Sequence, residues 1–109
     1  MVDNLFAGPR PTEGEEAFDT LLAASFAQGD RVRLERIVSN GVRFGEWYDQ
    51  AWDEWVMVAC GEAVLEWGDG TTVGLVAGDY LRIEARRRHR VVRTSADCVW
   101  LAFHLGGGE

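Results

Sequence analysis

The chain has 109 residues, 47% of them apolar and five of them tryptophan, which is enough for one domain with a hydrophobic core and too few for two. Its formal net charge of −7 argues against general affinity for nucleic acid or for an anionic membrane surface. No apolar run approaches the ~18–20 residues that cross a bilayer, and residues 1–10 lack the pattern of a signal peptide, so we expect a cytoplasmic protein.

The N-terminal part of the chain predicts an extended arm followed by one short helix. Residues 1–11 are polar and contain both prolines, which favours an extended conformation. Thr12 and Glu15 then have the spacing of a capping box. From residue 18 to residue 25, apolar or small side chains fall at positions i, i+3, i+4 and i+7, as in an amphipathic helix. We therefore expect a helix over residues 13–24 that covers one face or one end of the remaining structure.

The rest of the chain predicts short strands separated by turn residues. Apolar and polar side chains alternate in these segments, and glycine, asparagine, aspartate or serine stands between them. The expected strands cover residues 32–38, 44–48, 54–60, 62–67, 71–76, 80–83, 89–94 and 98–105. This number of short strands predicts a closed barrel or jelly roll.

We accordingly divide the chain into three parts. Residues 1–30 form the arm and the helix, residues 31–105 form the barrel, and residues 106–109 form a flexible, glycine-rich tail. The sequence contains no internal repeat and no second domain boundary.

Two stretches of the chain resemble the two motifs of the cupin superfamily. The first motif reads Gly-x5-His-x-His-x3–4-Glu-x6-Gly, and Glu54 and Gly61 fit its second half. The second reads Gly-x5-Pro-x-Gly-x2-His-x3-Asn, and Gly78 and His89 keep its spacing. The resemblance implies an all-β fold, the cupin-type double-stranded β-helix or jelly-roll barrel. It also implies a homodimer.

The resemblance further implies a divalent metal inside the barrel, which cupins hold with three histidines and one glutamate. Carried over by position, the ligands here are Tyr48, Gln50, Glu54 and His89. An imidazole and a carboxylate suit zinc, iron, manganese or nickel, whereas an amide oxygen and a neutral phenol are weaker ligands. Tyr48 and Gln50 are two residues apart, so their side chains share one face of an extended segment. Tyr48, Glu54 and His89 are also the catalytic candidates.

Four further residues are candidates for a substrate pocket. Trp47 and Trp52 flank the predicted site and suit the wall of a pocket for an apolar or aromatic ligand. Arg86 begins an arginine-rich stretch that leads to His89, and it either clamps an anionic substrate or belongs to a solvated loop. His104, on the last predicted strand, either faces the barrel or lies at the surface.

Two functions fit these residues. The first is a metal-dependent enzyme that acts on a small, anionic molecule inside the barrel. The second is a non-catalytic module that binds or senses a small molecule without a metal. The fold does not choose between them, because one fold hosts many chemistries.

Overall fold

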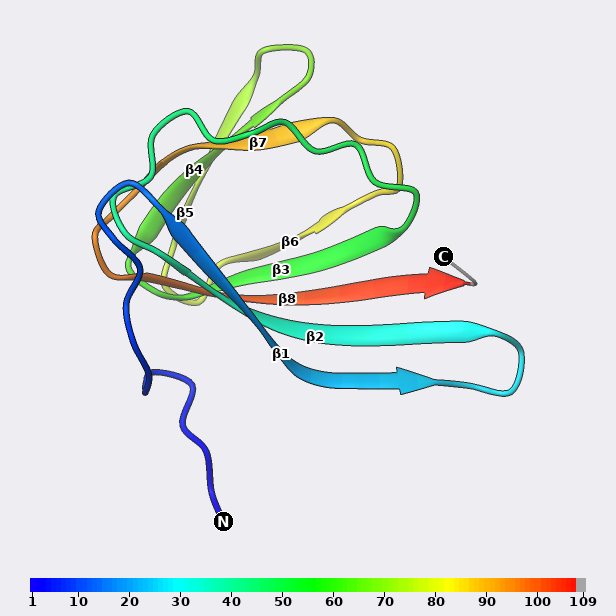
Figure 1. Ribbon diagram of the computed structural model, residues 1–109. Coiled ribbons are helices and arrows are strands. Elements are labelled where there is room, and N and C mark those ends of the chain that lie inside the picture. The colour runs from blue at the N-terminus through cyan, green and yellow to red at the C-terminus, as the bar shows by residue number, and fades with distance from the viewer. Residues whose placement is uncertain (108–109) are drawn as a thin grey trace.

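The computed structural model describes residues 1–107 of the chain as an all-β structure (Figure 1). Its strands are β1 (Glu16–Ser25), β2 (Asp30–Ser39), β3 (Asp53–Cys60), β4 (Glu62–Trp67), β5 (Thr72–Val76), β6 (Tyr80–Ile83), β7 (His89–Thr94) and β8 (Cys98–Gly107). They form one antiparallel sheet in the order β1-β2-β8-β3-β6 and a second in the order β5-β4-β7. The predicted all-β architecture is confirmed. Residues 1–107 contain no helix that could span a membrane.

The hydrophobic core lies between the two sheets, which face each other (Figure 1). Every second side chain of a strand points into this space, because successive side chains point to opposite faces of a sheet. The largest group of buried residues comprises Val56, Val58, Ala63, Leu65, Trp67, Leu75, Ile83, Cys98, Trp100 and Ala102. The strands predicted from turn glycines and from alternating side chains therefore enclose the hydrophobic core of the barrel.

The segment predicted as a helix over residues 13–24 forms strand β1 instead, so that prediction is wrong. β1 lies at the edge of the larger sheet and pairs with β2 from Glu16 to Ser25. A helix of about 12 residues is marginal on its own. Backbone hydrogen bonds to a neighbouring strand satisfy the same groups, so pairing with β2 decides the conformation.

A bulge in β1 explains why the sequence resembles a helix. The register with β2 shifts between Thr20 and Leu22, which leaves Leu21 unpaired. An extra residue reverses the alternation of side chains. Phe18 consequently lines the space between the sheets, while Leu22 lies on the opposite face. The spacing that resembles a helix therefore combines residues from opposite faces of one strand, on either side of the bulge.

The segment between β2 and β3, residues 40–52, runs beside β7 (Figure 1). The strand expected over residues 44–48 is reduced to an isolated bridge, in which Tyr48 and His89 exchange backbone hydrogen bonds of 2.8 and 3.0 Å. Phe44 has a φ of 48°, and this left-handed conformation interrupts a regular strand. The bridge nevertheless brings Tyr48 next to His89.

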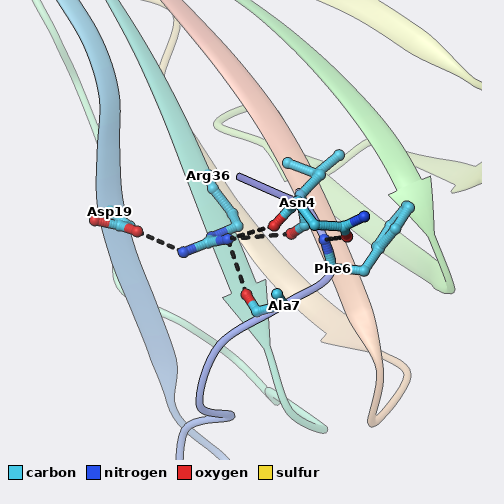
Figure 2. Close-up of polar contacts among 6 residues, drawn as sticks. Asn4, Phe6, Ala7, Asp19 and Arg36 are labelled. Carbon is cyan, nitrogen blue, oxygen red and sulfur yellow. Dashed lines mark hydrogen bonds and ion pairs between the residues drawn. The ribbon is translucent and has the colours of Figure 1, made fainter. Parts of the chain in front are cut away.

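The N-terminal arm is held on the outer side of the larger sheet by Arg36 (Figure 2). Its Nη1 donates hydrogen bonds to the backbone carbonyls of Asn4, Leu5 and Ala7 at 3.4, 3.2 and 3.0 Å. Its Nη2 forms an ion pair with Asp19 of β1 at 2.5 Å. The arm is thus attached to β1 and β2, away from the space between the sheets.

The first two residues of the predicted flexible tail, residues 106–109, belong to a strand. Gly106 and Gly107 belong to β8, where they pair with Arg31 and Asp30 of β2. Residues 108–109 lie outside the described residues.

Candidate functional site

A cavity of about 340 Å³ lies between the two sheets. Part of its wall is apolar and consists mainly of Ile37, Val56, Leu65, Ile83, Val91 and Trp100. The other part carries polar side chains from β1, β2, β3, β7 and β8 and from the segment before β3. Its volume falls at the small end of the range of about 300–1,000 Å³ typical of small-molecule sites.

His89 presents one ring nitrogen to this cavity. Its Nδ1 lies 2.8 Å from the carbonyl oxygen of Arg87, and because a carbonyl only accepts, Nδ1 carries the proton and donates it. In the neutral imidazole, Nε2 then holds the lone pair. The ring is stacked on Tyr48, with centroids 5.8 Å apart, and meets the edge of Trp67 at 6.2 Å. These contacts fix both the tautomer and the orientation of the imidazole.

Glu54 is buried on the cavity wall, with 7% of its surface exposed. Its Oε1 accepts a hydrogen bond of 2.7 Å from Nε2 of Gln50. The backbone carbonyl of Gln50 accepts a hydrogen bond of 2.7 Å from the backbone N–H of Arg86. One carboxylate oxygen is therefore fixed, while Oε2 has no hydrogen-bond partner among residues 1–107 and is not sealed from solvent.

A second polar group lies beside Glu54. His104 is its direct partner across β3 and β8, and Nδ1 of His104 accepts a hydrogen bond of 2.9 Å from Nε1 of Trp52. Nε2 of His104 lies 3.1 Å from Oε1 of Glu35 on β2. Trp52, His104 and Glu35 all line the cavity, so this end of the wall is a continuous hydrogen-bonded network.

Tyr48 reaches the cavity as a neutral phenol. Burial raises the pKa of its hydroxyl above the ordinary 10.0, and the negative charges of nearby glutamates raise it further. These glutamates are Glu16, Glu46, Glu35 and Glu54. Since the pKa is raised, Tyr48 of the metal-free protein keeps its proton at neutral pH and is a hydrogen-bond donor.

Glu16 of β1 forms part of the same wall. Its carboxylate accepts a hydrogen bond of 2.5 Å from the hydroxyl of Ser39, which accepts one of 3.0 Å from Nε1 of Trp100. Burial raises the pKa of Glu16 above 4.5, and the Ser39 hydrogen bond opposes that rise. Glu16 is thus a partly buried carboxyl with a tendency to keep its proton.

The structure places Trp47 and Arg86 outside the cavity lining. Trp47 lies beneath the guanidinium groups of Arg88 and Arg90, at 4.0 and 4.5 Å. Arg86 is largely exposed and lies 3.5 Å from Asp49. The arginine-rich stretch therefore packs on aromatic rings and carboxylates at the surface, and the role of Arg86 in binding an anionic substrate stays a prediction.

Comparison with known proteins agrees with this geometry. The family profile of the cupin domain matches residues 34–104. This chain belongs to the cupin family. A comparison of this cupin with curated proteins gives no match.

Solved structures similar to this cupin include a protein of Ralstonia eutropha JMP134 that is provisionally named a mannose-6-phosphate isomerase. The two chains are 40% identical, the match covers 95% of this chain and 96% of the other, and the TM-score is 0.78. KdgF from a Halomonas species is 14% identical over 88% of this cupin and 84% of its own chain, with a TM-score of 0.69. A conserved double-stranded β-helix protein of Klebsiella pneumoniae is 18% identical over 99% and 90%, with a TM-score of 0.70. The last two likenesses show the fold alone.

The side chains of this cupin fit a resident divalent metal poorly. Glu54 and His89 are good ligands and line one cavity. Gln50, however, directs its amide nitrogen to Glu54, and the phenol of Tyr48 is a weaker ligand than the histidine that cupins have at this position. Within residues 1–107 there is no group of three or more His, Cys, Asp or Glu side chains arranged to hold a metal ion. The four-residue ligand set and the homodimer stay predictions.

Sequence reasoning missed three charged residues of the cavity, Glu16, Arg33 and Glu35. Arg33 and Glu35 alternate with apolar residues in β2, and such alternation is usually taken to mean a solvent-facing polar side. In this cupin the charged side of β2 faces the cavity instead. The alternation in the sequence could have indicated these residues only if the charged side had been assigned to the interior.

Proposed function

We propose that this cupin binds a small, uncharged, hydroxyl-bearing molecule in its barrel and catalyses proton transfer on it. The observation that carries the proposal is the state of Glu54 and Glu35, each of which has one oxygen held by a side-chain donor while the other has no partner. A carboxylate oxygen of this kind accepts a hydrogen bond from a ligand hydroxyl. The rings of Trp52 and Trp100 offer flat surfaces for the C–H groups of such a ligand.

The charge of the cavity favours an uncharged ligand. Three carboxyl groups line it, those of Glu16, Glu35 and Glu54, against the single guanidinium of Arg33. Glu16 tends to keep its proton, but an anionic group beside the carboxylates of Glu35 and Glu54 would meet like charges in a partly buried site, where repulsion is poorly screened. This argues against the anionic substrate expected from Arg86.

Glu54 and His89 are the groups suited to proton transfer. Oε2 of Glu54 would carry a carbon-bound proton between adjacent carbons of a hydroxy-carbonyl compound. Nε2 of His89 would carry the hydroxyl proton between the adjacent oxygens, so the product is an isomer and no atom is gained or lost. The neutral phenol of Tyr48 would donate a hydrogen bond to the oxygen on which negative charge develops. The provisional name of the 40% identical relative supports this reaction class.

Proton exchange tests the proposal. The protein is incubated in D2O with D-mannose, D-fructose and mannose 6-phosphate, and deuterium at the carbons beside the carbonyl group is followed by NMR. We expect exchange with an uncharged sugar and a loss of about 100-fold or more in E54Q, the scale of general acid–base catalysis. Glu62 of β4 is exposed, so E62Q is the matched control and keeps the wild-type rate.

Two results would redirect the proposal. Equal exchange in E54Q and wild type would remove Glu54 from the chemistry. Sugar binding without exchange, measured by titration of tryptophan fluorescence, would leave a non-catalytic binding module.

A divalent metal held by His89 and Glu54 is a second candidate, favoured by the free Nε2 of His89. Elemental analysis of protein purified without chelators tests it beside H89A and E54A. Near-stoichiometric metal that disappears in both variants would support a metal site. No metal in wild type after reconstitution with zinc, iron, manganese and nickel would remove this candidate.

A further inference from the structure

We infer that Trp52 and His104 are positioning residues that make Glu35 a second ligand-binding carboxylate of the cavity. The inference rests on the proposed binding of a hydroxyl-bearing molecule and assigns it a second anchoring point. Glu35 and His104 lie outside the two sequence motifs, and Trp52 occupies a variable position of the first motif, between Gln50 and Glu54.

Trp52 determines the tautomer of His104. An indole nitrogen only donates hydrogen bonds, and Nε1 of Trp52 lies 2.9 Å from Nδ1 of His104. Nδ1 must therefore hold a lone pair. The proton of the neutral ring then resides on Nε2, which lies 3.1 Å from Oε1 of Glu35 and donates to it. Each hydrogen bond of the network consequently has one direction only.

The network fixes the carboxylate of Glu35. The side chains of His104 and Glu35 are only 10% and 13% exposed, so little water competes for their contact. Trp52 and His104 also meet edge to face, with ring centroids 6.1 Å apart. Glu35 is thereby restrained at Oε1, while Oε2 has no hydrogen-bond partner among residues 1–107 and is not sealed from solvent.

Glu35 and Glu54 approach the cavity from different strands. Glu35 lies on β2 and Glu54 on β3, and β8 with His104 lies between them. Neighbouring strands are about 5 Å apart, and Glu35 pairs with Ala102 of β8 whereas Glu54 pairs with His104. Two strand intervals and this offset of two residues separate the backbones of the two glutamates by about 12 Å. A ligand between them would contact one carboxylate at each end. Glu35 then recognises a hydroxyl remote from the atoms that react at Glu54 and His89.

NMR of the imidazole nitrogens tests the first step without any ligand. Long-range proton–nitrogen spectra distinguish a ring protonated at Nε2 from one protonated at Nδ1. We expect His104 of the wild type to carry its proton on Nε2, and W52F to contain a measurable share of the Nδ1–H form. A wild-type ring protonated at Nδ1 would overturn the inference.

Variants of Glu35 and His104 test the second step by titration of tryptophan fluorescence with D-mannose and D-fructose. We expect E35Q and H104L to weaken sugar binding about tenfold or more, since each removes or releases a charged hydrogen-bonding group. H104Q is the conservative variant, because its amide oxygen accepts from Trp52 and its amide nitrogen donates to Glu35. It should stay within about threefold of wild type.

The two proposals fail in different ways. If the wild type binds no sugar, the proposed function fails and the role of Glu35 as a ligand-binding group falls with it, while the tautomer measurement still judges Trp52 and His104. If the wild type binds sugar and E35Q binds equally well, the inference fails and the proposed function stands. E62Q again serves as the control that keeps wild-type affinity.

Discussion

Glu54 and His104 lie directly opposite each other on β3 and β8, yet each holds a different partner. Glu54 is bound by Gln50, and His104 connects Trp52 to Glu35. Two separate hydrogen-bonded groups therefore meet at one cross-strand pair. This pairing brings a motif residue and a residue outside the motifs to the same side of the cavity.

Replacing Gly61 by alanine is predicted to lower the free energy of unfolding for a conformational and a steric reason. Its φ is +83°, and a Cβ added there would lie 2.4 Å from Oγ of Ser95 and 2.9 Å from Cα of Cys98. We expect G61A to lose about 1–2 kcal/mol from the left-handed conformation and about 1–3 kcal/mol more from overpacking. Urea denaturation measures the loss of free energy of unfolding.

Gly70 provides the matched control for this loss. Its φ is +90°, but no atom lies within 4 Å of an added Cβ, so G70A shows only the conformational cost of about 1–2 kcal/mol. Equal losses in G61A and G70A would contradict the predicted contact with Ser95 and Cys98.

The ionisation of Glu16 should lower stability as the pH rises. Burial raises the folded-state pKa of Glu16 above 4.5, so the folded protein holds this proton more tightly than the unfolded chain does. This tighter binding of the proton stabilises the fold below pH 4.5, and the stabilisation is lost as the pH rises through the raised pKa. We expect the free energy of unfolding of E16Q minus that of wild type to grow over this range and then level off. Urea denaturation at a series of pH values measures the difference, and a constant difference would contradict the prediction.

The two cysteines should differ sharply in reactivity. Cys98 is fully buried, and burial raises the pKa of its thiol to about 12, so almost no thiolate exists at neutral pH. Cys60 is free and partly exposed. We expect native protein to react with one equivalent of a thiol reagent, denatured protein with two, and native C60S with none. Rapid reaction of two equivalents in the native state would disprove the burial of Cys98.

Trp47 should stabilise the fold through its contacts with arginine. The guanidinium of Arg88 lies 4.0 Å from its ring centroid, and such an exposed cation–π contact contributes about 0.5–1 kcal/mol. A double-mutant cycle with W47L and R88Q should give a coupling of this size. A coupling near zero would mean that Trp47 acts by apolar packing alone.

The strands from β3 onward were predictable because local signals agree with the tertiary structure. Gly61 and Gly78 both have positive φ, and the segments between such turns alternate apolar and polar side chains. The resemblance to the cupin motifs also implied that Glu54 and His89 would face the barrel interior, and both line the cavity.

The N-terminal third was harder to predict because its signals conflict with its environment. The bulge at Leu21 gives β1 an apparent helical period. Glu35 looks like a surface residue in the sequence, but a hydrogen bond from His104, 69 positions away, makes its burial tolerable. Pattern reasoning does not capture a partner so distant in the chain.

Tyr48, Gln50 and Trp52 reach the cavity from five consecutive residues that belong to neither sheet. Their stretch follows β7 through the bridge at Tyr48 and adds little to the buried core. Three side chains of one cavity wall therefore come from a short stretch that contributes no residue to the main buried cluster. Exchanging this stretch for that of another cupin would transplant a binding preference, while the strands beneath it keep their pairing and their packing.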